Sequence, residues 1–335
     1  MKKKYRINII LIVLISFIVV FFSLKDNFNE SIDYLLHLNI LWILLAILFM
    51  FLNIFFQSLS QYRFLKEVKP DYKFSSCFKL MMMAMFFNGI TPFSSGGQPF
   101  EMYLLNKEGV KVSDSANALL QNFITYQCAL IFMGAVAIGL NKILGIFPDG
   151  NMLKNVVVVG FLINLLVMLL IVFISRAKRL NTKVFSKIFN FIFGFKFIKN
   201  REEKKAKAEK TLDDFYNSTA IMKNNFKNTV LSFTFNLCSL LCLYIIPLFI
   251  FYSMKEYVKI DAIKSIVLSG YTFLIGSFVP IPGATGGLEY GFMDFFGVFI
   301  KGGLLSASML VWRLITYYLG MVAGGITLIT YRKKE

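Results

Sequence analysis

The chain has 335 residues, of which 57% are apolar and 16% are charged. A mean hydropathy of +0.65 excludes an ordinary soluble globule and predicts an integral membrane protein. The formal net charge of +17 would suggest a nucleic-acid partner if the protein were soluble. Membrane proteins, however, collect lysine and arginine in their cytoplasmic loops. We therefore expect membrane lipids, and no nucleic acid, as partners.

Catalysis and metal binding find little support in the residue types present. No nucleotide-binding loop, Ser/His/Asp grouping or HExxH run occurs in the sequence. The single histidine, His37, cannot build a multi-ligand site. The four cysteines show no metal-ligand spacing with it: Cys77, Cys128, Cys238 and Cys242. We expect no catalytic residue, no metal and no cofactor.

The apolar runs predict about six transmembrane helices, because about 20 apolar residues are needed to cross a bilayer core of ~30 Å. The first run follows a basic N-terminus, as in a signal peptide. It is longer than the usual apolar core of a signal peptide and no small-residue cleavage site follows, so we interpret it as an uncleaved span. The six expected spans are 7–24, 39–58, 115–140, 153–175, 229–252 and 304–330.

Two further apolar segments, 79–105 and 263–300, are interrupted at their centres. Residues 88–99 read Asn-Gly-Ile-Thr-Pro-Phe-Ser-Ser-Gly-Gly-Gln-Pro, and residues 280–289 read Pro-Ile-Pro-Gly-Ala-Thr-Gly-Gly-Leu-Glu. Proline and glycine break helices, so we expect re-entrant hairpins here. Such backbone is tolerated at membrane depth only where protein buries it or it lines a wet cavity.

The two breaks also resemble each other. An offset of 190 residues aligns Gly96 and Gly97 with Gly286 and Gly287, and places Pro92 on Pro282. Matched breaks on opposite faces are typical of inverted-repeat transporters, although so short a match also arises by coincidence. We expect one all-α transmembrane domain over 1–335, with halves 1–175 and 229–335 joined by a basic linker, 176–228.

Charge predicts the topology. With both termini in the cytoplasm, the inner segments hold 28 basic residues and the outer ones seven. We therefore expect a multi-pass protein of the cytoplasmic membrane, in which the first hairpin enters from the cytoplasm and the second from outside. The linker is either a plain positively charged loop or a helix lying on the anionic leaflet.

Polar groups at membrane depth are the candidate functional residues. Arg313 lies about ten residues into the last apolar run, where an arginine lines a path, snorkels, or pairs with Glu289 or Asp294. Glu101 and Glu289 each follow a Gly-Gly break, and we expect both in the first turn of the next helix, either as caps or beside amide nests that bind anions, with Arg313 as counter-charge. The candidate headgroup path comprises Asn88, Ser94, Ser95, Gly96, Gly97, Gln98, Glu101, Thr285, Gly286, Gly287, Glu289 and Arg313.

These motifs together resemble the transmembrane, flippase-like domain of the lysylphosphatidylglycerol synthase family. The resemblance rests on residues 88–101 and 280–289 and on Arg313 with the Tyr-Tyr-Leu-Gly run at 317–320, and it extends over nearly the whole chain. Its members look like translocators of aminoacylated phosphatidylglycerol or polyprenyl-linked glycans. The family tends to carry an acidic residue in the third span, where this chain has Gln121 and Gln127.

The resemblance implies a flippase for anionic, aminoacylated or polyprenyl-linked lipids. The alternative is a lipid-modifying enzyme of the phosphatidylglycerol lysyltransferase type, or a membrane subunit of one. That enzyme would need a separate soluble transferase and would bind tRNA, because we expect this chain, which ends just after its last span, to lack the soluble lysyltransferase domain. A non-transporting scaffold and an oligomer both stay open.

Overall fold

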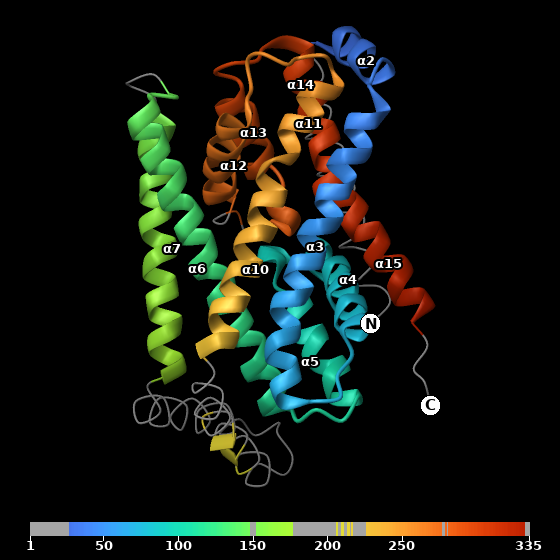
Figure 1. Cartoon of the computed structure of the whole chain (residues 1–335), viewed down its shortest axis with the longest axis vertical. Helices are drawn as coiled ribbons and strands as arrows, with labels where there is room; N and C mark the ends of the chain where they lie inside the picture. The colour runs from blue at the N-terminus through green and yellow to red at the C-terminus, as the bar shows by residue number, and fades with distance from the viewer. Residues whose placement is uncertain are drawn as a thin grey trace, which may run out of the picture.

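In a computed structural model of the chain, the structure describes residues 27–147, 152–176, 226–276, 279 and 281–331, with a few positions between 206 and 216. The regular elements of these ranges are all helical and form a tall bundle (Figure 1), which confirms the expected all-α class. The expected first span and most of the expected linker lie outside the described residues.

Four stretches are long and apolar enough to cross a membrane: α3 (Ile40–Val68), α6 (Val112–Leu144), α10 with α11 (Phe226–Tyr244 and Ile246–Ser253), and α14 with α15 (Gly302–Arg313 and Leu319–Thr330). They match four of the predicted spans. A fifth, 153–175, is the helix α7 (Met152–Arg176), which has 25 residues. At a rise of 1.5 Å per residue, the 29 residues of α3 extend about 43 Å, enough to cross a bilayer.

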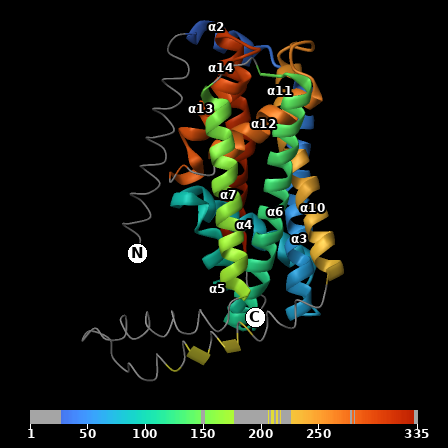
Figure 2. The same ribbon diagram turned by 90° about the vertical axis from the view of Figure 1, so that its left-hand side faces the viewer.

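The two interrupted segments form helical hairpins at opposite ends of the bundle. The first comprises α4 (Phe74–Ile90), the 3₁₀ turn η1 (Pro92–Ser94) and α5 (Gly97–Lys107). The second comprises α12 (Ala262–Gly276), the 3₁₀ turn η2 (Pro282–Ala284) and α13 (Gly287–Phe296). Figure 1 shows α5 in the lower half and α12 and α13 in the upper half, and the side view agrees (Figure 2). Each hairpin therefore returns to the end from which it starts.

The predicted alignment of the two halves extends to the helix boundaries. At the offset of 190 residues, η1 and η2 begin at aligned prolines, α5 and α13 at aligned glycines, and α6 and α14 at aligned positions. Ser94 and Ala284 are also aligned, and both have φ of 51°, a left-handed conformation that is uncommon for residues other than glycine. The helix boundaries of the two breaks thus repeat in opposite orientations, as an inverted repeat requires. The backbone differs at the aligned glycines, because φ is −80° at Gly96 and +91° at Gly286.

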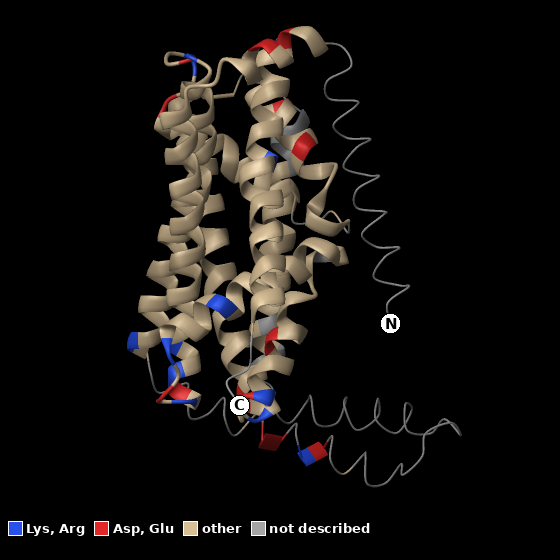
Figure 3. Ribbon diagram, turned by 90° about the vertical axis from the view of Figure 1, so that its right-hand side faces the viewer, with Lys and Arg blue, Asp and Glu red and all other residues tan. Residues whose placement is uncertain are grey.

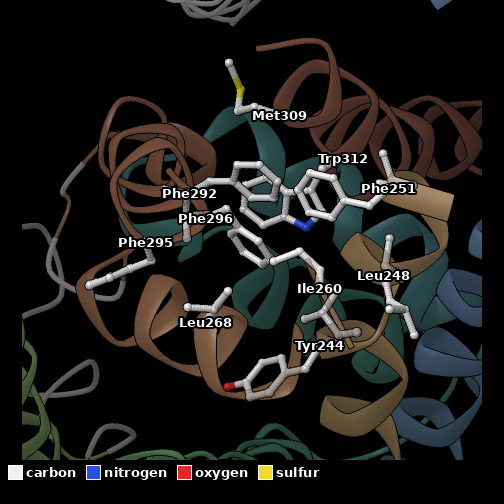
Figure 4. Packing of buried hydrophobic residues seen from close by; sticks show 14 of the residues in the cluster. Tyr244, Leu248, Phe251, Ile260, Leu268, Phe292, Phe295, Phe296, Met309 and Trp312 are labelled. Atoms are coloured by element: carbon white, nitrogen blue, oxygen red, sulfur yellow. The ribbon is translucent and has the colours of Figure 1, made fainter. Parts of the chain in front are cut away.

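Each half packs against the other along its whole length. Helix α3 lies against α10, and α4 lies against α15 (Figure 1). The upper half contains a stacked aromatic core, in which the ring of Trp312 lies 4.9 Å from that of Phe292, beside Phe296 and Phe251 (Figure 4). Many apolar side chains of α7 stay exposed, as lipid-facing positions do.

Charged residues are distributed unevenly along the bundle. Figure 3 shows lysine and arginine gathered at the lower end, where α3 and α5 end, and acidic residues on the short helix α2 (Phe28–Leu36) at the upper end. The positive-inside rule then favours the lower end as the cytoplasmic one. Because this argument depends on charge alone, the orientation stays a prediction.

The close approach of α15 to α4 gives a stability prediction. A Cβ at Gly324 would lie 2.3 Å from the carbonyl oxygen of Met82, so Gly324→Ala forces the two backbones apart and should cost about 1–3 kcal/mol. A Cβ at Gly139 in α6 meets nothing within 4 Å, so Gly139→Ala should instead stabilise by about 0.5–1 kcal/mol. Thermal unfolding in detergent measures both, and an equal melting temperature for the two variants would contradict the packing.

Candidate functional site

The two broken segments contact each other midway along the bundle. Turn η1 packs on η2, and the hydroxyl of Tyr317 donates a hydrogen bond of 2.8 Å to the carbonyl oxygen of Gly89 at the end of α4. Gly283, at φ +64°, lies under the same ring, where a Cβ would approach Tyr317 to 2.2 Å. Glycine is therefore required at this position for both conformation and space.

The amides of the first break already have partners within the chain. Asn88 Oδ1 accepts from the amide of Gly97, and Thr91 Oγ1 accepts from that of Gly96, each at 2.8 Å. The amide of Ser94 donates to the carbonyl oxygen of Thr91, and that of Ser95 to the carbonyl oxygen of Pro92, each at 3.2 Å. The prediction of a free anion-binding nest is therefore wrong here, because Asn88 and Thr91 occupy the donors.

The second break is closed by Glu289. Its Oε2 accepts a hydrogen bond of 2.7 Å from the amide of Gly286. Glu289 therefore caps α13, which was one of the two alternatives predicted for it. The amide of Thr285 donates to the carbonyl oxygen of Pro282 at 3.3 Å. The amides of Thr285 and Gly286 are thus already bonded within the chain, so they are not free to bind an anion as predicted. Orphan amides at membrane depth cost several kcal/mol each, which explains why both breaks are closed.

The side chain of Arg313 is buried and has partners in the second break and the last span. Its Nε lies 2.7 Å from Oε1 of Glu289, and both side chains are buried, with 5% and 6% of their surface exposed. The angle makes this a charge contact, since Nε forms no aligned hydrogen bond. One Nη atom donates to the carbonyl oxygen of Gly283 at 3.1 Å and to Thr285 Oγ1 at 3.3 Å. The Tyr317 ring lies 4.5 Å from the guanidinium carbon.

The structure selects one of the alternatives for Arg313, the ion pair with Glu289. Asp294 is not its partner. In this conformation the guanidinium is neutralised and hydrogen-bonded, so it is not an open counter-charge for a phosphate. A π-helical turn, η3 (Leu314–Tyr318), follows Arg313 directly and joins α14 to α15. Such turns occur frequently at functional sites.

Glu101 is not where the sequence predicted it. The first turn of α5 contains no acidic residue, so Glu101 does not cap this helix, and Asn88 does so in its place. Glu101 lies one turn further along and is buried, with 3% exposed. Its Oε1 accepts a hydrogen bond of 3.0 Å from Nε2 of Gln61 in α3. It therefore belongs to a separate polar cluster and not to the break.

The remaining predicted residues divide by exposure. Ser94, Ser95 and Gln98 in the first break are exposed, whereas Thr285 in the second is buried. Thr91, Gly283 and Tyr317 hold the two breaks but were not among the predicted path residues, although all three fall in the motifs on which the family resemblance rests. Tyr317 also follows Arg313 by four residues, which predicts the same helical face. Gln61 was not predicted either, and it contacts Glu101 in the separate cluster.

The ion pair predicts strongly coupled mutations. Arg313→Gln leaves a buried carboxylate uncompensated and should destabilise by about 3–5 kcal/mol, with Glu289→Gln acting similarly on the guanidinium. Because the double variant buries no unpaired charge, it should lose clearly less than the sum of the single losses. Denaturant unfolding in micelles measures this cycle. Lys264→Gln, which removes a partly exposed pair with Asp261, is the control and should cost under about 1 kcal/mol.

Comparison with known proteins supplies the family. A comparison with curated proteins finds no match. The family model described as the lysylphosphatidylglycerol synthase TM region matches residues 9–324, which include both hairpins and Arg313. The chain therefore belongs to the lysylphosphatidylglycerol synthase transmembrane-region family, as a multi-pass membrane protein connected with lysylphosphatidylglycerol-related lipid processing.

Proposed function

We propose that this protein is a flippase of the cytoplasmic membrane that moves lipids with anionic, aminoacylated or polyprenyl-linked headgroups from one leaflet to the other. The observation that carries the proposal is the meeting of two hairpin breaks, from opposite ends of the bundle, at mid-height. Inverted-repeat carriers place their substrate sites at such meeting points and expose them alternately to the two sides.

Exposed polar side chains at the first break support a headgroup path. Ser94, Ser95 and Gln98 are exposed although they lie in or beside the first break, where the two hairpins meet. Polar groups facing lipid tails without a hydrogen-bond partner cost roughly 2–7 kcal/mol. The Ser95 hydroxyl donates to the carbonyl oxygen of Pro92 at 2.8 Å, so this argument rests on Ser94 and Gln98. Their exposed polar groups are best accounted for by water or a polar headgroup beside them. Their hydroxyl and amide groups suit phosphate and sugar oxygens, whereas the backbone amides are already bonded.

The Arg313–Glu289 pair supplies a means of selecting anionic headgroups. A phosphate that reached this pair would compete with Glu289 for the guanidinium, and Glu289 would keep its bond to the amide of Gly286. Displacing the contact would also loosen η2, because Arg313 holds the carbonyl oxygen of Gly283. Substrate binding and movement of the second hairpin would thus be coupled.

Lipid transfer in reconstituted vesicles tests the flippase. Purified protein should accelerate the movement of labelled phosphatidylglycerol or lysylphosphatidylglycerol between leaflets. Replacing Ser94, Ser95 and Gln98 together by leucine should lower the rate by about tenfold or more, since each lost hydrogen bond is worth about 1 kcal/mol. Thr234→Leu is the matched control, because this exposed hydroxyl on α10 bonds only its own helix.

Folded protein that moves none of these lipids, nor a lipid-linked glycan, would contradict the proposal. Formation of lysyl-lipid by the purified chain from charged tRNA would favour the transferase alternative.

Labelling tests the wet path separately from transport. In a background without the four native cysteines, Ser95→Cys should react rapidly with a water-soluble maleimide in intact vesicles. Thr285→Cys and Ser239→Cys should react slowly, because both positions are buried, at 2% and 0% exposed. A cysteine at position 95 that reacts only with a lipid-soluble reagent would place the first break in the lipid and remove the path.

A further inference from the structure

A second carboxylate, Glu101, is buried away from the breaks in a setting unlike that of Glu289. Glu101 is 3% exposed, and its side chain accepts a hydrogen bond of 3.0 Å from the side-chain amide of Gln61. Among the described residues, no lysine, arginine or histidine lies within ion-pair distance of it. Glu289, by contrast, has Arg313 at 2.7 Å. Glu101 and Glu289, the two buried carboxylates among the described residues, therefore differ in their compensation.

The groups that face Glu101 are neutral. From α4 and the loop before it come the thiol of Cys77 and the phenol of Tyr72, the two titratable groups whose charge would interact with Glu101. A thiol and a phenol are neutral when protonated and anionic when deprotonated, so neither supplies a cation. From α3 comes Gln61, and behind it stands Asn122 of α6. The cations on these helices face other groups: Arg63, Lys66 and Lys107 lie over the rings of Phe235, Tyr62 and Tyr103. None of the described cations forms an ion pair with Glu101.

The amide that contacts Glu101 has a fixed orientation. Oε1 of Gln61 accepts from Nδ2 of Asn122 at 3.4 Å, which turns the NH₂ group of Gln61 toward the carboxyl. Asn122 in turn accepts from the hydroxyl of Ser60 at 2.6 Å, and Ser60 accepts from Asn236 of α10 at 2.9 Å. This neutral network joins α3, α5, α6 and α10. A lone donor from Gln61 binds a carboxyl oxygen but cannot neutralise a full charge.

We propose that Glu101 is a proton-binding site, protonated in this conformation and able to release its proton when water enters the lower half of the bundle. An isolated ionised carboxylate in an apolar interior is so costly that the group takes up a proton instead. A metal cation is disfavoured as the occupant, because the Gln61 NH₂ group points at the site and hard cations require several oxygen ligands. A proton needs none of these.

Proton release at Glu101 would supply a coupling ion for transport, and this part rests on the proposed flippase function. The carboxyl lies on α5, the returning helix of the first hairpin. If this hairpin moves against α3, the contact with Gln61 opens, and water replaces it as a stabiliser of the ionised form. The protonation state would then follow the conformation, as in other membrane proton relays. Protonation itself does not depend on transport.

Infrared spectroscopy of the protein in vesicles tests protonation directly. Wild-type protein at neutral pH should show the carbonyl band of a protonated carboxylic acid, which Glu101→Gln should remove. Glu256→Gln should keep the band, because this loop carboxylate, although partly desolvated, accepts the amides of Lys259 and Val258, which lower its pKa. An identical band in wild type and Glu101→Gln, or no band in either, would overturn the proposal.

Stability against pH provides a second readout. A proton held in the folded chain but lost from the unfolded one makes the folded state less stable as pH rises above the ordinary glutamate range. Between pH 5 and 7, the unfolding equilibrium constant of wild type should therefore rise by up to about tenfold per pH unit relative to Glu101→Gln. Equal pH dependence of the two proteins would contradict a bound proton. Glutamine imitates the neutral acid, so this variant should fold.

A transport measurement separates the two proposals. If both hold, a proton gradient should change the rate of lipid transfer in wild type and leave that of Glu101→Gln unchanged. The infrared band without any lipid transfer would retain the proton site and reject the flippase. If wild type transfers lipid at a rate that does not depend on the proton gradient and shows no infrared carbonyl band, the proton site is rejected and the flippase is retained.

Discussion

Every backbone N–H that leaves a helix at bilayer depth must find an acceptor inside the protein, and the two hairpins are organised around this constraint. Water is not available there, so an unpaired amide costs several kcal/mol. Asn88 and Thr91 meet the requirement at the first break, and Glu289 meets it at the second. The glycines follow from the same need, since a Cβ at Gly97 would approach Asn88 Oδ1 to 2.5 Å.

The two breaks are capped by different groups, and this explains why the buried carboxylates Glu101 and Glu289 have different surroundings. Because a neutral amide closes the first break, no arginine is needed beside it. The second break is closed by the carboxylate of Glu289, and the buried charge of this group is compensated by Arg313. Glu101 takes no part in capping and remains among neutral side chains. The inverted repeat thus preserves the helix boundaries, whereas the charges of the two halves are not equivalent.

Local chemistry explains which parts of this architecture the sequence predicted. Proline and glycine act on their own backbone, so both breaks and their alignment follow from residues 92–97 and 282–287 alone. The positive φ of Ser94 and Ala284 was not predicted, because neither residue is a glycine. Apolar length likewise predicts the long helices. The first span and the linker lie outside the described residues, and the orientation in the membrane stays a prediction.

Partners in the folded site were harder to predict, because they depend on contacts distant in sequence. Gln61 and Glu101 are 40 residues apart, and Tyr317 and Gly89 are 228 apart. The expected free nests failed for a related reason. Asn88 precedes Gly97 by nine residues, and nothing in the sequence shows that the chain folds back so that its side chain reaches that amide. Glu101 was misplaced by one helical turn, which was enough to move it from the break into a different cluster.

Closed breaks also bear on how such a bundle can move. A hairpin whose amides are satisfied by its own residues exposes no new backbone when it shifts, so it moves as a unit at little cost. Besides the packing of η1 on η2, side-chain hydrogen bonds join the last span to both hairpins: Tyr317 donates to Gly89 of the first, and Arg313 donates to Gly283 of the second. Both arise at or beside the π-helical turn between α14 and α15, where the helical hydrogen-bond pattern is already irregular. Motion between the halves would therefore concentrate at this turn, while the hairpins themselves stay intact.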